Sequence, residues 1–106
     1  MKACEWVSSQ RARLSDLRFG RDTDILPRAK TADGFEISIQ ASQYHYCCPR
    51  ITFDGPYTAY ELGYPSEDET LIESYREGDI FPFVPSDLVE ELVEKHGGIV
   101  GKGGSL

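Results

Sequence analysis

The chain has 106 residues, a formal net charge of −7 and 40% hydrophobic residues, which is the size and composition of one small folded domain. The strong negative charge disfavours direct binding to DNA, RNA or an anionic membrane, because phosphate groups and acidic side chains repel each other. The sequence shows no apolar run of about 18 residues, no apolar leader segment and no disulfide framework among its three cysteines, so we expect a cytoplasmic protein with reduced thiols.

The charged residues are distributed unevenly along the chain. Residues 35–106 contain 13 Asp and Glu against 4 Lys and Arg, whereas residues 1–34 contain 5 against 7. This asymmetry predicts a basic N-terminal arm and linker over residues 1–34, followed by a small acidic domain over residues 35–106 that ends in a short flexible tail. Within the arm, residues 1–18 are predicted to form a weakly periodic helix and residues 19–34 an irregular linker.

Three later segments have the alternation of apolar and polar side chains that is typical of β-strands. In residues 35–42 the alternation is unbroken, and residues 57–63 follow a Gly-Pro turn, so the two segments are expected to pair antiparallel. Residues 80–84 are also strand-like, but Pro82 has no N–H group to donate to a neighbouring strand. This segment is therefore predicted to lie at the edge of the sheet.

Two segments have the features of amphipathic helices. Ser66 and Glu69 have the spacing of a capping box, which predicts a helix over residues 67–76. A second helix is predicted over residues 86–96 from a stripe of side chains at helical spacing, which are Leu88, Val89, Leu92, Val93 and His96. The sequence thus predicts an α+β fold, with a small antiparallel sheet of three to four strands and two amphipathic helices packed on one face.

The two predicted helices carry a high density of acidic residues. Solvated helix faces commonly mix both signs of charge, whereas a surface of one sign steers an oppositely charged partner and raises its association rate. Helix capping, compensation of the helix dipole and solubility are the structural alternative. With Tyr44 and Tyr46 as aromatic anchors, the candidate partner-binding residues are Glu67, Asp68, Glu69, Glu73, Glu90, Glu91 and Glu94.

A loop between two of the predicted strands combines His45, Cys47 and Cys48. Histidine nitrogens and cysteine sulfurs are common ligands of zinc, and a thiolate beside a base is a nucleophile, so these residues form a candidate thiol or metal site. Adjacent cysteines on an extended backbone point to opposite faces, however, and the paired spacing of a structural zinc site is absent. The structural alternative is one cysteine packed in the core. The leading expectation is a protein without metal or cofactor.

Three stretches of the sequence resemble a known class of small proteins. They are Ile39–Ser42 leading to Tyr46–Arg50, Gly55–Tyr57, and Phe83–Pro85 leading through Val89–Val93 to His96–Gly98. Over about residues 37–98 they resemble small uncharacterised proteins encoded by tailed bacteriophages and prophages. The resemblance brings no active-site residues with it. It implies a setting in which small acidic accessory proteins, anti-CRISPR proteins among them, bind and inhibit host enzymes or defence complexes.

These observations lead to one functional hypothesis and two alternatives. We expect a non-enzymatic, phage-type accessory protein that acts in the host cell cytoplasm and uses its acidic surface to bind and inhibit a host protein with a basic surface. The first alternative is a small thiol- or zinc-dependent protein that uses His45, Cys47 and Cys48. The second is a homo-oligomeric structural component of a virion. Besides a host protein, a second copy of the chain in a homodimer is kept as a candidate partner.

Overall fold

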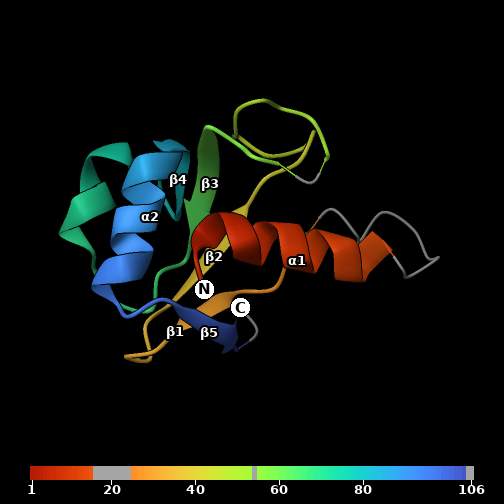
Figure 1. Cartoon of the computed structure of the whole chain (residues 1–106). Coiled ribbons are helices and arrows are strands. Elements are labelled where there is room, and N and C mark those ends of the chain that lie inside the picture. Colours follow the sequence, from red (N-terminus) through yellow and green to blue (C-terminus); the bar gives the residue numbers. More distant parts are fainter. Residues whose placement is uncertain (16–24, 54, 105–106) are drawn as a thin grey trace.

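The computed structural model of the chain describes residues 1–15, 25–53 and 55–104. Its centre is a five-stranded antiparallel sheet with the strand order β4-β3-β2-β1-β5 (Figure 1). The strands are β1 (Ala29–Thr31), β2 (Glu36–Gln40), β3 (Ala59–Gly63), β4 (Ile80–Pro85) and β5 (Ile99–Lys102). The predicted α+β class and the antiparallel sheet are confirmed, with β1 and β5 as strands that the sequence patterns do not predict.

The three segments predicted as strands lie side by side as β2, β3 and β4. Ile39 of β2 lies opposite Leu62 of β3 and both are buried, so these side chains point from one face of the sheet into the core. β4 is an edge strand, as Pro82 predicts. The register of the β3–β4 pairing shifts between Tyr60 and Leu62. These two residues are two positions apart in β3, but their partners in β4, Val84 and Phe81, are three positions apart. This β-bulge contains Phe83.

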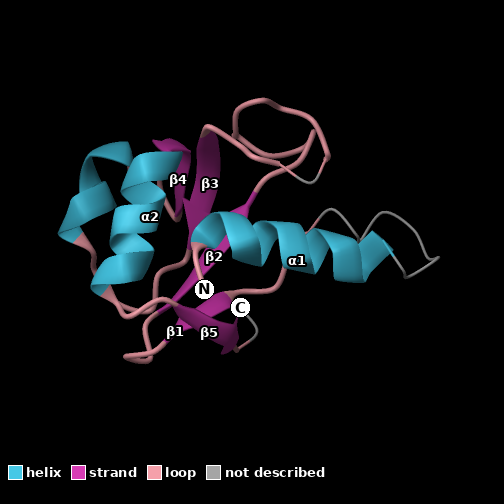
Figure 2. Ribbon diagram, viewed as in Figure 1, coloured by secondary structure: helices cyan, strands magenta, loops and turns pink. Residues whose placement is uncertain are grey.

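The helical elements are α1 (Ala3–Ser15), the 3₁₀ helix η2 (Thr70–Tyr75) and α2 (Ser86–Lys95) (Figure 2). α1 and α2 contact each other and both contact the sheet, so they cover the same face of it. The predicted helix over residues 86–96 is confirmed, and its apolar stripe lies in the core. None of the helices in the described part of the chain has the length and apolar character needed to cross a membrane.

The predicted helix over residues 67–76 forms only as the shorter helix η2. Ser66 does not cap it, because its N–H donates to the carbonyl of Glu36 at 2.8 Å and its hydroxyl accepts the N–H of Glu36 at 2.9 Å. Glu69 is the N-cap instead and accepts the N–H of Leu71. Strand β2 thus takes the hydrogen-bonding groups of Ser66, and the helix starts later than predicted.

The described parts of the N-terminal segment belong to the folded unit rather than to an arm. Trp6 and Val7 of α1 lie in the same core as the sheet residues. The buried guanidinium of Arg11 donates to the carbonyl of Ala41, just beyond β2. β1 pairs with both β2 and β5, so the predicted domain boundary falls in the turn between β1 and β2. Residues 16–24 of the predicted linker lie outside the described residues.

The predicted flexible tail is built into the fold as far as residue 104. β5 pairs with β1, and beyond it the N–H of Gly103 donates to the carbonyl of Arg28 at 2.7 Å. The N–H of Gly104 donates to the carboxylate of Glu36 at 2.6 Å. Residues 105–106 are not among the described ones. The C-terminal segment therefore forms one edge of the sheet.

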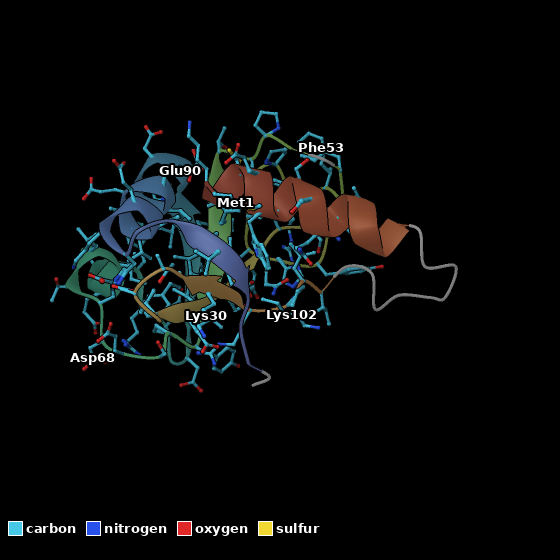
Figure 3. All side chains as sticks on the ribbon, turned by 60° about the horizontal axis from the view of Figure 1, so that its bottom comes forward. Met1, Lys30, Phe53, Asp68, Glu90 and Lys102 are labelled. Atoms are coloured by element: carbon cyan, nitrogen blue, oxygen red, sulfur yellow. The ribbon has the colours of Figure 1, made fainter. Side chains whose placement is uncertain are left out.

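The carboxylate of Glu90 joins α2 to the start of α1. It accepts the N–H groups of Ala3 at 2.7 Å and Cys4 at 3.0 Å, which have no partner within the first turn of a helix. Figure 3 shows Glu90 beside the start of α1, near Met1. A carboxylate at this position also meets the positive end of the helix dipole. Glu90 therefore stabilises α1 from a different helix, as an N-cap residue would.

We predict that Glu90→Ala lowers the free energy of unfolding by about 1–2 kcal/mol, because two partly buried N–H groups lose a charged acceptor. The matched control is Glu91→Ala, which makes the same change at the next, exposed position of α2 and should cost less than about 0.5 kcal/mol. Urea denaturation followed by circular dichroism measures both values. Equal values for the two variants would contradict the capping role of Glu90.

Candidate functional site

Five of the seven acidic candidates project into solvent at one end of the molecule. Asp68 extends outward from the segment before η2 (Figure 3), and α2 packs against η2, so the acids of the two elements share this end. We define the acidic surface by these exposed carboxylates, which are Glu67, Asp68, Glu73, Glu91 and Glu94. The structure thus brings together most of the residues that the charge pattern selects.

The other two acidic candidates, Glu69 and Glu90, are turned into the fold. Glu69 is only 4% exposed and accepts hydrogen bonds from Lys95, His96 and a backbone N–H group. Glu90 holds the first turn of α1. Neither carboxylate is free to meet a partner, which corrects the expectation from the charge pattern. Within α2, Glu90 points toward α1 whereas Glu91 points into solvent, because side chains at neighbouring helical positions point about 100° apart.

The basic side chains near the acidic surface are already engaged. The guanidinium of Arg76 is 2.9 Å from Glu73 and also stacks over the ring of Phe81 at 4.9 Å. The ammonium of Lys95 is 2.8 Å from the buried carboxylate of Glu69. In the part of the chain that the structure describes, Glu67, Glu91 and Glu94 are in no ion pair. The surface therefore keeps most of its negative charge uncompensated.

His96 lies at the point where three distant parts of the chain meet. Its Nδ1 is 2.7 Å from Asp33 in the turn between β1 and β2, and its Nε2 is 2.8 Å from Glu69 at the start of η2. The ring stacks on Phe35, with the ring centroids 4.1 Å apart. Ionised carboxylates only accept hydrogen bonds, so both ring nitrogens must donate, and the imidazole is held as the cation.

The pKa values of this cluster agree with that geometry. Burial lowers the pKa of His96, but the hydrogen bonds to Glu69 and Asp33 outweigh burial and leave the pKa raised. The pKa of Asp33 is lowered to about 2, first by the hydrogen bond from the N–H of Phe35 and then by the bond from His96. Burial raises the pKa of Glu69, but the bonds from Lys95 and His96 leave it lowered. The folded state thus favours a charged histidine between two ionised carboxylates.

This cluster positions other elements and does not itself resemble a reactive centre. Both ring nitrogens of His96 are occupied, and Phe35 covers the ring, so the imidazole has no free atom for a substrate. The N–H of Asp33 also donates to the carbonyl of His96 at 3.2 Å, which adds a backbone contact to the side-chain bonds. The end of α2 and the start of η2 are therefore fixed to the sheet, and the acidic surface has a rigid support.

Tyr44 and Tyr46, the two predicted aromatic anchors, are 63% and 45% exposed. The ring of Phe83 lies against Tyr46, with centroids 5.8 Å apart, and the guanidinium of Arg50 lies 5.1 Å from the Tyr46 centroid. We call Tyr46, Phe83 and Arg50 the aromatic patch. Sequence reasoning did not select Phe83 or Arg50 as binding residues. A simple strand pattern gives no sign of the bulge that turns Phe83 outward.

His45, Cys47 and Cys48 do not form a common site. Cys47 is buried, its thiol donates to the carbonyl of Ser42 at 3.2 Å, and burial raises its pKa. Cys48 is exposed, and the backbone there pairs with Ala59. Nδ1 of His45 is 2.6 Å from the hydroxyl of Ser42. Among the described residues no group of three His, Cys, Asp or Glu is placed to hold a metal ion, so the geometry favours a structural loop.

Comparison with known proteins adds no site residues to this description. No protein-family model matches the chain, and no curated protein or solved structure matches it. The acidic surface and the aromatic patch are therefore candidates on the strength of this chain's own geometry and charge.

We predict that the free energy of unfolding declines above about pH 6.5 and again in acid. A histidine with a raised folded-state pKa stabilises the fold below its usual pKa of 6.5, and this contribution is lost as the pH rises through the folded-state value. Carboxyl groups with lowered pKa values stabilise the fold above their usual 3.8 and 4.5, and this contribution is lost as the pH falls. Urea titrations over a pH series measure the profile.

The control for the upper limb of this profile is His96→Gln, which keeps a hydrogen-bonding side chain but cannot take a proton. We expect this variant to be less stable than the unmodified chain at pH 6, by about 1.5–3 kcal/mol, because the buried carboxylate of Glu69 loses one charged donor and keeps Lys95 and the N–H of Leu71. Above pH 6.5 its stability should change much less with pH. An equally steep decline in the variant would assign the pH dependence to other groups.

Proposed function

We propose that this chain is a non-enzymatic accessory protein that binds a basic surface of another protein and thereby inhibits it. The observation that carries the proposal is the acidic surface. Its five exposed carboxylates lie on α2, on η2 and just before η2. Arg76 pairs with two of them, Glu73 and Asp68, and Lys95 pairs with the buried Glu69, so among the described residues Glu67, Glu91 and Glu94 have no cation beside them. Uncompensated charge of one sign attracts an oppositely charged partner and accelerates its association.

The rigid attachment of the acidic surface supports this proposal. The bonds of His96 to Asp33 and Glu69 fix both acidic elements before any partner arrives. Charges that are fixed in advance lose little conformational freedom on binding, so more of their interaction with the partner appears as affinity. A flexible acidic tail would steer a partner equally well but would lose more entropy when it is ordered.

The resemblance to small phage and prophage proteins supplies the proposed setting. A small acidic protein made in an infected bacterium meets host nucleases and defence complexes whose nucleic-acid grooves are lined with Lys and Arg. An acidic surface would occupy such a groove in place of phosphate groups, which is inhibition of the anti-CRISPR type. This setting rests on the sequence resemblance alone, whereas the preference for a basic protein partner rests on charge and geometry.

We predict that Glu67→Gln, Asp68→Asn and Glu91→Gln together slow association with a basic partner roughly tenfold at low ionic strength. All three side chains are exposed, and among the described residues the one ion pair lost is the long one between Asp68 and Arg76 at 3.9 Å. The circular dichroism spectrum should therefore stay unchanged. The partner is captured from a bacterial lysate and identified by mass spectrometry, and association rates of the purified pair are then measured at increasing salt.

The control raises the net charge by the same three units outside the acidic surface, with Ala12→Lys, Ile25→Lys and Val100→Lys at exposed positions. It should associate much faster than the acidic-surface variant. If both variants slow association equally, net charge alone is responsible and the acidic surface is not the binding site. Binding that does not weaken between about 0.1 M and 1 M salt would also contradict the proposal, because the screening length falls from about 10 Å to 3 Å.

A further inference from the structure

A cavity of about 630 Å³ lies on the face of the sheet opposite α1 and α2. Ser38 and Gln40 of β2 line it. They alternate with the core residues Ile37 and Ile39, so their side chains project from the other face of the sheet. The segment before β1 passes over this face, because the amide of Gln40 bonds both the N–H and the carbonyl of Leu26, at 2.8 and 2.7 Å. The enclosed space is within the range of about 300–1,000 Å³ that small-molecule sites occupy.

The two ends of this cavity differ in charge. Strand β2 runs between them and spans roughly 13 Å from Glu36 to Gln40. At the Glu36 end, Arg28 lies 3.8 Å from the Glu36 carboxylate, and Lys102 pairs with the residue that follows Arg28. Both cations line the cavity. At the other end Gln40 lies opposite Glu61 of β3, whose carboxylate projects from the same face. The cavity is therefore basic at one end and acidic at the other.

Two hydrogen-bond donors that line the cavity have no acceptor in the described part of the chain. Nε of Arg28 is buried and has no hydrogen-bond partner. The hydroxyl of Ser38, a residue that is only 6% exposed, accepts the amide N–H of Gln40 at 2.9 Å and has no acceptor for its own proton. Buried donors are nearly always paired in folded proteins. These two, beside two cations, point to an anionic oxygen group that a ligand would supply.

The carboxylate at the opposite end keeps much of its capacity to accept. Glu61 accepts the N–H of Tyr46 at 2.9 Å, and among the described residues no cation lies within ion-pair distance of it. An ionised carboxylate accepts several hydrogen bonds, so a ligand donor can be added here without displacing the Tyr46 N–H. Ile25, Pro27 and Tyr64 also line the cavity and provide apolar surface for a hydrocarbon chain.

We propose that this cavity binds a small zwitterionic molecule, with an anionic oxygen group at Arg28 and Lys102 and an ammonium group at Glu61. A ligand with one charge would pair with one end and leave the charged groups of the other end without a partner. A ligand with both charges and a short hydrocarbon chain between them pairs with both ends. The acidic surface on α2 and η2 takes no part in this site, so either can be correct without the other.

The test compares four small probes that differ in their charged ends. Two carry both charges, 6-aminohexanoate and 4-aminobutyl phosphate, whereas hexanoate and hexylamine carry one each. Titration of the isotope-labelled full chain, followed by two-dimensional NMR, gives each affinity and shows which backbone amides move. We expect the amides of Arg28, Ser38, Glu61 and Lys102 to move together. The tighter of the two-ended probes identifies the anionic group as carboxylate or phosphate, and binding of either one supports the site.

The variants remove one charge at each end of the cavity. Glu61→Gln keeps a carbonyl for the N–H of Tyr46, and Lys102→Gln changes an exposed side chain. The matched controls are Glu91→Gln and Lys2→Gln, which make the same changes of charge at exposed positions that do not line this cavity. The NMR spectrum of each variant without probe shows that the fold is retained.

We expect 6-aminohexanoate to bind about tenfold tighter than hexanoate or hexylamine, because it makes charged hydrogen bonds at both ends. Glu61→Gln should remove this advantage over hexanoate, and Lys102→Gln should weaken binding about threefold, since Arg28 remains. Both controls should bind as the unmodified chain does. The proposal fails if neither two-ended probe moves the cavity amides, if the one-ended probes bind equally well, or if the controls weaken binding as much as the cavity variants.

Discussion

The hydrogen bonds of His96 to Asp33 and Glu69 are the contact on which the arrangement of the acidic elements depends. They connect the end of α2, the start of η2 and the turn between β1 and β2, which are distant in sequence. The close approach also requires Gly97, because a Cβ atom there would lie 2.8 Å from the side chain of Ala32, and its φ is +92°. Without this contact, α2 and η2 would still pack through their buried apolar side chains, but the polar bonds that fix their ends to the sheet would be lost.

The same type of side chain has two opposite roles in this small protein. Glu69 accepts hydrogen bonds from two cationic side chains, and Glu90 accepts two N–H groups at the start of α1. Glu91 and Glu94, in contrast, are exposed to solvent. The inward carboxylates lower the free energy of the folded state because each has several hydrogen-bond donors. The outward ones contribute little to stability and raise the repulsion within the surface. Their presence on one surface is consistent with an interaction with another molecule.

The sequence predicts those helices and strands that are long enough to show a periodic pattern of apolar side chains. β2, β3, β4 and α2 each contain enough alternating or helically spaced side chains to be located within a few residues. β1 and β5 have three and four residues, too few to show a period, and their pairing joins Ala29 to Lys102 from opposite ends of the chain. The acceptor that starts α1 is 87 residues away, so no local signal marks it.

For the candidate site, the charge count locates the acidic surface but not the direction of each carboxylate. Glu90 and Glu91 are equivalent in any count of charge, and only the packing of α1 against α2 distinguishes them. Exposure of Tyr44 and Tyr46 agrees with the prediction that they are available to a partner. Phe83 and Arg50 could not be assigned to the same patch from sequence, because a bulge and a long loop bring them together.

The acidic surface and the aromatic patch are fixed by independent interactions. His96 fixes the acidic surface, and the β-bulge fixes the aromatic patch, where Tyr60 pairs with Val84 on one side of Phe83, whose φ is +52°, and Leu62 with Phe81 on the other. A left-handed conformation costs a non-glycine residue about 1–2 kcal/mol, a considerable share of the stability of a small domain. A fold tolerates such a cost only where regular pairing on both sides determines the backbone, as it does here. The direction of the Phe83 ring is consequently set during folding, and a partner that contacts it does not have to order it. Independent support for the two features also allows the charge of one and the apolar exposure of the other to change separately.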